Sequence, residues 1–532
     1  MAAKGRRTAE ATAHTPNVSH HLKKTNLKYS DYINEITSNE IYDGLIGCGM
    51  FAEKIPKFLT SSDFLDYTKT LALPITNVKD KDYVRYSSMR NINIPRPMAI
   101  PEPFAYTNLC NSISQDWNRI QKFFEFETRN QEYKVSRIHL RKMDNTCALF
   151  EMNYKNYEKD DSPEEELLIK SKYLVNADIS NFFPSIYSHS IPWALKGKQF
   201  CKLRVNRGSH LWFNQLDFYT RNVKYGETNG VLIGPHVSNL ISEIILAKVD
   251  KSLIQKGYSF LRFIDDYTCY VESYEQAENF LIDLSEELKK YELKLNDKKS
   301  EIVPLPQASV KNWVNKLNNY IFTNTYQHQG KESLRLKELK AFLDFTIQLF
   351  LDEKKDSAIL NYAIKIISKK HIGVNARKYF INQIHHLVLL FPYLIHLLDE
   401  YVFEPHNLTS NEIKNISQNI YEYGLKKRFY EANSYALFWS LKYNFQLDGI
   451  LTDLKKNSEK SEDTVYLLLA YLYEKRLGNS LTDYRKIARK LKPDFDRFWL
   501  FIYEVLAWTE LSSEFRAMKQ NSGISFVKQA YR

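Results

Sequence analysis

Cysteine is scarce in this chain, and no metal-binding or redox spacing links the five copies. They are scattered at Cys48, Cys110, Cys147, Cys201 and Cys269, with no C-x-x-C pair. This distribution argues against a zinc site or a disulfide framework, and it favours a reducing environment.

Long apolar segments are missing as well. The longest apolar run, residues 387–398, contains Pro392 and His396 and is too short to span a bilayer. The N-terminal stretch is small and polar without an apolar core, so we expect no secretory signal and a disordered tail over residues 1–24. The sequence therefore predicts a soluble, cytoplasmic protein with no membrane partner.

Glycine-rich phosphate loops are also absent. Gly44, Gly47 and Gly49 lie close together, but no G-K-[ST] follows them and the Rossmann spacing is not present. We interpret these glycines as turn residues. The pattern gives no support to a P-loop enzyme or a dinucleotide-binding enzyme.

What the chain does have is length and positive charge. Its 532 residues are too many for one ordinary core, so at least two domains are expected. The net charge of +11 and the pI near 9.0 favour a polyanionic partner, nucleic acid first and an acidic membrane surface second. Lysine-rich helices that are simply well solvated would explain the charge equally well.

Hydrophobic periodicity predicts an α+β domain over residues 25–320. The prolines of Arg85–Pro103 predict an extended basic segment, and the alternation in Val135–Arg141 predicts a strand with its basic residues on one face. Further strands are expected at Lys172–Ala177 and on both sides of a hairpin turn within Tyr258–Glu272. The helix between them should begin at an N-cap, Ser238, and end at Gly257.

From residue 321 to residue 532 the composition changes. Glycine is rare, and leucine, isoleucine, tyrosine and phenylalanine recur at helical spacing between short polar connections. We find no clean repeat period. The expectation is an all-α, solenoid-like domain of degenerate HEAT-like helical repeats with basic edges.

Three aspartates stand at the ends of predicted strands. Asp178 ends one strand, and Asp265 and Asp266 form the tip of the predicted hairpin. An Asp-Asp pair by itself most often sits in an ordinary solvated turn. If the strands are neighbours in one sheet, however, the three carboxylates converge and repel one another unless divalent cations lie between them. Two such ions support in-line displacement at phosphorus, which is the chemistry of nucleotidyl transfer.

The motifs around these aspartates resemble the fingers-palm region of a reverse transcriptase. DISNFF, GVLIGPHVSN, FIDD and LNDKKS follow the order of that family's motifs A to D. The resemblance implies two Mg²⁺ ions, or Mn²⁺ in their place, held by Asp178, Asp265, Asp266 and Ile179. It implies that Phe183 excludes the ribose 2′-hydroxyl and that Lys299 assists departure of pyrophosphate. It also implies nucleotide contacts from Gly234, Ser238, Arg137 and Arg141.

Two segments resemble a narrower group. FAEKIPKFLTSSDF and RPMAIPEPFAY are similar to the bacterial abortive-infection and defence-associated reverse transcriptases, in which a helical-repeat domain follows the palm. This resemblance implies antiviral defence, closed homo-oligomers and, in some members, template-independent synthesis primed by a protein tyrosine. Tyr29, Tyr32 and Tyr42 are the candidate primers. Other members of the group work with a noncoding RNA.

The sequence departs from the family pattern at two positions. Ile233 stands where glutamine is usual, which weakens the case for ordinary templated copying, and Phe263 stands where tyrosine is common. The leading hypothesis is a magnesium-dependent DNA polymerase of the defence type, with dNTPs as substrates and DNA as product. One alternative is an RNA-templated reverse transcriptase of retron or group II intron-like type. The other is a non-catalytic RNA-binding assembly protein.

Overall fold

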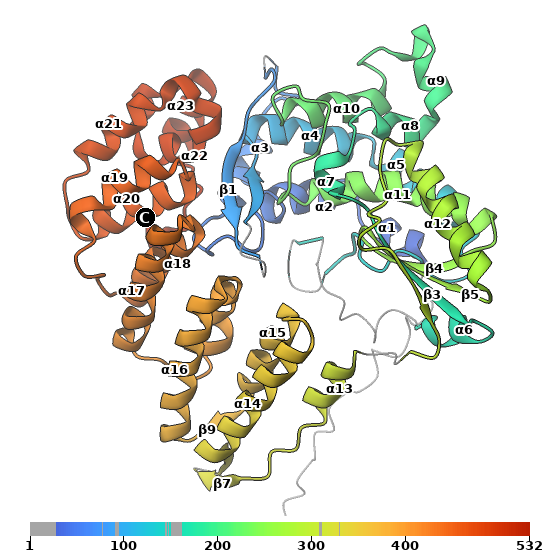
Figure 1. Ribbon diagram of the computed structural model, residues 1–532. Helices are drawn as coiled ribbons and strands as arrows, with labels where there is room; N and C mark the ends of the chain where they lie inside the picture. Colours follow the sequence, from blue (N-terminus) through green and yellow to red (C-terminus); the bar gives the residue numbers. More distant parts are fainter. Residues whose placement is uncertain are drawn as a thin grey trace, which may run out of the picture.

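The computed structural model describes residues 28–76, 78–90, 95–143, 146, 148–149, 162–307, 311–328 and 330–532. The tail predicted over residues 1–24 lies outside the described residues. Figure 1 shows the strand-containing part on one side of the molecule, and the helices of the C-terminal half continue along the bottom and up the opposite side.

A four-stranded antiparallel sheet forms the centre of the first part. Its strands are β3 (Tyr173–Asp178), β4 (Ser259–Phe263), β5 (Asp266–Val271) and β6 (Glu301–Pro304), in the order β4-β5-β3-β6. Helix α12 (Tyr274–Lys289) contacts β3 and β5, and α11 (Val237–Gln255) contacts α12. The predicted hairpin and the order of strands and helices are confirmed.

Five short helical segments connect β3 to α11: α7 (Phe182–Ser185), α8 (Ser190–Lys196), α9 (Lys198–Lys202), η3 (Arg204–Asn206) and α10 (Trp212–Asn222). The predicted N-cap of α11 is wrong, because His236 precedes the helix and Ser238 lies inside its first turn. The Ser238 hydroxyl donates instead to the Leu232 carbonyl at 2.6 Å. Gly257 follows the end of the helix with φ +89, as predicted.

The N-terminal region surrounds a two-stranded hairpin of β1 (Val84–Ser88) and β2 (Arg96–Ile100). This hairpin confirms the extended segment predicted from the prolines. The helical segments of the region are α1 (Tyr29–Asn34), α2 (Ser38–Asp43), η1 (Gly44–Cys48), α3 (Ser62–Thr68), α4 (Pro103–Gln115), α5 (Trp117–Thr128) and α6 (Glu164–Leu168).

The strand predicted at Val135–Arg141 is wrong. A single bridge joins Ser136 to Arg262 of β4, and residues 135–141 are otherwise irregular. The segment is buried on every side, and the rings of Tyr29 and Tyr32 pack against His139. The alternating pattern therefore marks a buried irregular segment, not a strand with one basic, solvated face.

The C-terminal half is mostly helical but not purely so. After α13 (Asn312–Asn318), strands β7 (Thr325–His328), β8 (Lys331–Leu334) and β9 (His371–Ile372) form a small sheet. The all-α expectation is wrong here, because Gly330 turns with φ +73 and lets β7 and β8 pair as a hairpin. The remaining segments are α14 (Leu336–Asp352), α15 (Ser357–Ile367), α16 (Val374–Leu390), η4 (Pro392–Leu397), η5 (Asp399–Phe403), α17 (Ser410–Lys427), α18 (Tyr430–Tyr443), α19 (Leu451–Ser461), α20 (Thr464–Arg476), α21 (Thr482–Lys490), η6 (Lys492–Asp494), α22 (Phe495–Val505), η7 (Trp508–Glu510), α23 (Ser513–Ser522) and η8 (Gln529–Tyr531).

Two described regions far apart in the sequence, residues 58–100 and the C-terminal helices, pack together. Strand β1 contacts α18, α20 and α22, so the β1–β2 hairpin lies against the C-terminal helices (Figure 1). The backbone N–H of Thr60 donates to the Phe526 carbonyl at 2.8 Å, and that of Lys528 donates to the Phe58 carbonyl at 2.8 Å. The C-terminal helices thereby fix the position of the N-terminal hairpin.

The cysteines depart from expectation at one position. Cys48 is disulfide-bonded, whereas Cys110, Cys201 and Cys269 are free and buried. Among the described residues, the helices are all too short or too polar to cross a membrane.

A buried acid at the start of α4 makes the stability depend on pH. Glu102 is 1% exposed and accepts a hydrogen bond from the Ala105 N–H at 2.7 Å, and burial raises its pKa from 4.5 to about 7. The folded state thus favours the protonated acid, and stability is lost as the pH rises through about 7. We expect Glu102→Gln to remove up to about 3 kcal/mol of this loss. Denaturant melts at pH 5 and pH 8 measure how much the free energy of unfolding falls between the two pH values. The exposed Glu125→Gln is the control, and an equal pH dependence in wild type and Glu102→Gln would contradict the assignment.

Candidate active site

The strand ends bring two of the three predicted aspartates face to face. Asp178 is the last residue of β3, Asp266 is the first residue of β5, and the two are directly paired in the antiparallel register. Asp265 precedes Asp266 in the turn between β4 and β5, and its carbonyl accepts a hydrogen bond from the Ile179 N–H at 3.3 Å. The sheet therefore gathers the three residues at one edge.

The turn that carries Asp265 has an unusual backbone. Phe263 pairs with Asp266, so Ile264 and Asp265 alone make the loop, and Ile264 has φ +59. A two-residue hairpin loop requires a positive φ, but a β-branched side chain is unfavourable there. The guanidinium of Arg262 donates to the Ile264 carbonyl at 2.8 Å, and this hydrogen bond stabilises the turn. Such strain at a short polar turn is typical of functional sites.

Arg262 belongs to a buried ion network that was not predicted from the sequence. Its side chain is fully buried, donates to Glu243 Oε1 at 2.7 Å and lies 2.8 Å from Asp250 Oδ2. The Tyr267 hydroxyl donates to Asp250, and the Tyr29 hydroxyl donates to Glu243, each at 3.0 Å. The network fixes β4 to α11 directly behind the acidic turn.

Asp178 is held by two residues of the segment that follows α12. Lys299 Nζ lies 2.9 Å from Asp178 Oδ2, and Asn296 Nδ2 donates to Oδ1 at 2.8 Å. The Asn296 N–H also donates to the Asp178 carbonyl at 2.7 Å. The structure thus places the predicted cation Lys299 at the carboxylate edge, with its side chain largely exposed.

Burial and neighbouring carboxylates raise the pKa values of Asp265 and Asp266. Burial, followed by the neighbouring Asp266, raises the pKa of Asp265 from 3.8 to about 6, and Asp178 adds to the shift. Burial and Asp178 also raise the pKa of Asp266, while Lys299 acts in the opposite direction. The edge of the sheet is therefore rich in negative charge that a cation would stabilise.

The donor atoms suit a hard divalent ion. Three carboxylates supply oxygen ligands without sulfur or imidazole, which is the ligand set that Mg²⁺ prefers. In the part of the chain that the structure describes, no three acidic, histidine or cysteine side chains already form a metal-holding group. Asp178 is instead engaged by Lys299 and Asn296. Ile179 is buried, and only its carbonyl oxygen could serve as a ligand.

A cavity of about 370 Å³ gathers three of the five residues predicted to contact the nucleotide. Phe183, Gly234 and Ser238 all line it, together with side chains of α15 and η4. Gly234 has φ +131, and a Cβ there would lie 3.0 Å from the Ala99 carbonyl, so only glycine lets this loop approach β2. Phe183 is half-buried and packs against Phe182, with ring centroids 5.3 Å apart.

The cations of this cavity are not those predicted. Arg137 and Arg141 are buried away from it, and Arg141 lies over the Tyr32 ring at 5.1 Å. Lys54, Arg90 and Arg96 line the cavity instead. Burial and the neighbouring Arg90 lower the pKa of Arg96, and the charge of Asp265 acts in the opposite direction. The signal for Arg96 was present in the basic extended segment Arg85–Pro103.

The three candidate priming tyrosines are buried. Tyr29, Tyr32 and Tyr42 are 2%, 7% and 8% exposed. The Tyr29 hydroxyl donates a hydrogen bond to Glu243, and burial raises the pKa of Tyr29 well above the ordinary value. A priming hydroxyl must reach the transferred phosphate, so their burial in this conformation argues against all three as primers.

The comparison with known families agrees with this geometry. A model described as "Reverse transcriptase (RNA-dependent DNA polymerase)" matches residues 119–329, which include the three aspartates, Phe183 and Lys299. Residues 119–329 are a reverse transcriptase domain. The enzyme class of such a domain is nucleotidyltransferase. None of the curated proteins compared with this chain matches it significantly.

Several solved telomerases are similar in part. The truncated apo telomerase of Candida tropicalis aligns at 11% identity and a TM-score of 0.26, over 51% of this chain and 56% of that chain. The apo telomerase of the same organism aligns at 12% identity and a TM-score of 0.31, over 86% of this chain and 72% of that chain. The Candida albicans telomerase, in complex with a fragment of telomeric RNA, aligns at 12% identity and a TM-score of 0.28. The alignment covers 77% of this chain and 69% of that chain. TM-scores this low do not establish a shared overall arrangement.

Proposed function

We propose that the chain is a DNA polymerase that joins deoxynucleotides at the edge of the sheet carrying Asp178, Asp265 and Asp266. The carboxylates would hold two divalent ions, Mg²⁺ or Mn²⁺, which supply activation of the attacking oxygen and stabilisation of the leaving phosphate. Lys299 would neutralise the departing pyrophosphate. Phe183, with Gly234 and Ser238 behind it, would shape the pocket for the sugar.

One observation carries the proposal: within the reverse transcriptase domain, Asp178 and Asp266 are paired across β3 and β5 beside Asp265. Lys299 pairs with Asp178 alone, and like charges this close repel one another, so a purely structural role explains the three carboxylates poorly. A non-catalytic RNA-binding protein would have no use for such an arrangement.

We further propose a role in antiviral defence, with fingers and palm over residues 25–320 and a helical-repeat domain over residues 321–532. The resemblance of FAEKIPKFLTSSDF and RPMAIPEPFAY to the abortive-infection group supports this role. A noncoding RNA or another nucleic acid, and further copies of this chain, are the proposed partners. Ile233, which lines the nucleotide cavity, supports template-independent synthesis over the retron-like alternative.

The test is incorporation of labelled dNTPs by the purified full chain with Mg²⁺, with and without ribonuclease, followed by protease. Incorporation that survives ribonuclease supports template-independent synthesis, and a protease-sensitive product supports protein priming by a residue other than the three buried tyrosines. Loss after ribonuclease supports the RNA-templated alternative. No incorporation under any of these conditions would contradict the proposed polymerase.

Phe183 should decide which sugar is accepted. Replacing it with alanine opens the cavity beside Gly234, so a 2′-hydroxyl no longer meets the ring. We expect the ratio of dNTP to rNTP incorporation, measured as kcat/KM, to fall by roughly tenfold or more. Phe126→Ala, at an exposed ring, is the control. An unchanged ratio in Phe183→Ala would remove the residue from sugar selection.

Arg96 should bind the triphosphate in place of Arg137 and Arg141. Arg96 lines the nucleotide cavity, and a planar guanidinium can donate two hydrogen bonds to phosphate oxygens. For Arg96→Ala we expect the KM for dNTPs to rise roughly tenfold, with a smaller change in kcat. Arg129→Ala, on the exposed end of α5, should leave KM unchanged. A wild-type KM in Arg96→Ala would contradict the contact.

A further inference from the structure

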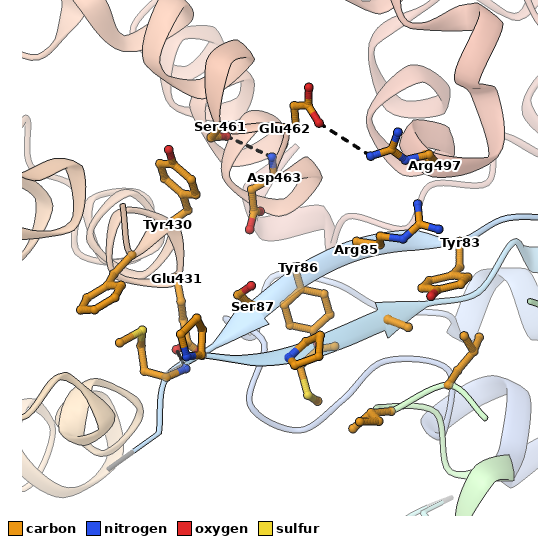
Figure 2. Close-up of a pocket in the computed structure, with 18 of the residues that line it drawn as sticks. Tyr83, Arg85, Tyr86, Ser87, Tyr430, Glu431, Ser461, Glu462, Asp463 and Arg497 are labelled. Atoms are coloured by element: carbon orange, nitrogen blue, oxygen red, sulfur yellow. Dashed lines mark hydrogen bonds and ion pairs between the residues drawn. The ribbon is translucent and has the colours of Figure 1, made fainter. Parts of the chain in front are cut away.

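A second cavity, of about 610 Å³, lies where the β1–β2 hairpin meets the C-terminal helices (Figure 2). It shares a wall with the nucleotide cavity, because Met89, Met98, Leu232 and Ile233 line both. The proposed polymerase reaction uses none of the polar groups that the second cavity contains. Its volume falls within the ordinary range for a small-molecule site.

One end of this cavity is cationic. Arg85 comes from β1 and Arg497 from α22, and Figure 2 shows the two side chains at the same end, on facing elements. Arg85 lies over the Tyr83 ring at 4.6 Å and pairs with Asp82 at 2.8 Å. Arg497 has a long, exposed contact of 3.7 Å with Glu462 and lies over the Phe498 ring at 5.6 Å. Two guanidinium groups that face each other across a gap suit a phosphate.

The floor of the cavity holds a polar atom that lacks a partner. Tyr86 is 7% exposed, and its hydroxyl has no hydrogen-bond partner among the residues that the structure describes. A buried hydroxyl left unpaired costs about 1–3 kcal/mol. A polar ligand group at this point would restore the missing hydrogen bond.

Two carboxyl groups lie near this hydroxyl. Asp463 Oδ1 caps α20 by accepting from the N–H groups of Val465 and Tyr466, each at 3.0 Å. Figure 2 shows the Asp463 side chain extending from the start of α20 toward β1. Glu431 Oε2 accepts from the Met89 N–H at 2.5 Å, and the carboxyl group is also hydrogen-bonded to the Ser88 side chain. Burial raises the pKa of Glu431 to about 7 and that of Asp463 to about 6.

Aromatic rings line the end opposite the arginines. Tyr430 is at this end in Figure 2, and its ring stacks on Tyr466 with centroids 5.9 Å apart and planes 8° apart. Phe429 lines the cavity beside it. A flat heterocycle can stack on such rings.

We propose that this cavity binds one nucleotide whose base carries an exocyclic amino group. The phosphate lies between Arg85 and Arg497, and the amino group donates to Asp463 or Glu431. The Tyr86 hydroxyl bonds the base edge, and the base stacks near Tyr430. Adenine, cytosine and guanine have the required amino group, whereas uracil and thymine lack it. The nucleotide can be free or part of a single strand, and the proposal does not depend on polymerase activity.

The test measures nucleotide binding to the full chain in EDTA, which removes the divalent ions that the proposed polymerase site needs. The probes are labelled 12-mers rA12, rC12 and rU12 by fluorescence anisotropy, and unlabelled AMP, CMP, GMP and UMP as competitors. We expect rA12 and rC12 to bind more tightly than rU12. Competition by AMP, CMP and GMP but not UMP identifies a free nucleotide as ligand, and binding of strands alone identifies a single strand.

Two variants and one control decide the assignment. Tyr86→Phe removes only the unpaired hydroxyl, so the melting temperature should stay the same or rise while affinity falls roughly five- to tenfold. Arg497→Ala should weaken all probes, and Arg485→Ala, an exposed arginine outside the cavity, should weaken none. Wild-type binding by Tyr86→Phe, or equal affinity for rA12 and rU12, would overturn the proposal even if Arg497→Ala binds weakly.

Discussion

We expect Asp178→Asn to abolish nucleotide incorporation, with a loss of at least roughly a thousandfold, or about 4 kcal/mol in the barrier. The amide keeps the size of the side chain and can still meet Asn296, but it removes one of the charges that would hold the metal ions. The Asp178 side chain is 12% exposed, but its partner Lys299 is 63% exposed and stays solvated when the pair is lost, so stability should change little. Incorporation of labelled dNTPs and a thermal melt measure both effects.

The control for this variant is a nearby aspartate outside the cluster. Asp297 lies between Asn296 and Lys299 in the chain but is exposed. Asp297→Asn should polymerise at the wild-type rate. Substantial incorporation by Asp178→Asn, or an equal loss in Asp297→Asn, would show that the charge on Asp178 is not what the reaction needs.

Arg262→Met should produce the largest loss of stability. It leaves Glu243 and Asp250 buried without their cation, which typically costs about 3–5 kcal/mol when one member of a buried ion pair is removed. It also removes the donor to the Ile264 carbonyl, so the turn that carries Asp265 loses its support. Denaturant melts should show the loss, and the variant should polymerise slowly even at temperatures where it remains folded.

An exposed arginine provides the comparison. Arg119 pairs with Asp116 at 2.5 Å, but its side chain is 61% exposed, so Arg119→Met should cost no more than about 1 kcal/mol. If Arg262→Met melts like Arg119→Met, the buried network is not what holds the acidic turn in place.

The sequence was sufficient to locate the carboxylates because their surroundings are local. Asp178 and the Asp265–Asp266 pair each adjoin a short apolar run, and alternation over such runs predicts strands well. The pairing of Asp178 with Asp266 then follows from the hairpin and the helix between the strands. Lys299 was found differently, from the resemblance of LNDKKS to a reverse transcriptase motif.

The errors have a different cause, which is burial by distant parts of the chain. Val135–Arg141 alternates like a half-buried strand, but α1 and β4 cover it from both sides, so Arg137 and Arg141 cannot reach the nucleotide cavity. Arg96 reaches it because the C-terminal helices hold the β1–β2 hairpin in place. No local pattern reports such contacts.

The buried ion network could have been predicted from charged residues that interrupt apolar segments of the sequence. Glu243 and Asp250 lie seven residues apart, hence on one face of an otherwise apolar helix, and Arg262 interrupts an apolar strand. Charged residues in such positions are rarely buried without partners. Pairing them would have predicted the packing of α11 against β4 from the sequence alone.

The most direct test of the central claim is a crystal structure of the full chain with Mn²⁺ and a non-hydrolysable deoxynucleoside triphosphate. Anomalous scattering locates the manganese ions without reference to activity. We expect two ions about 3.5–4 Å apart among Asp178, Asp265 and Asp266, with the triphosphate reaching Arg96. Manganese at other residues only, or triphosphate bound away from the three carboxylates, would contradict a two-metal polymerase site at this edge of the sheet.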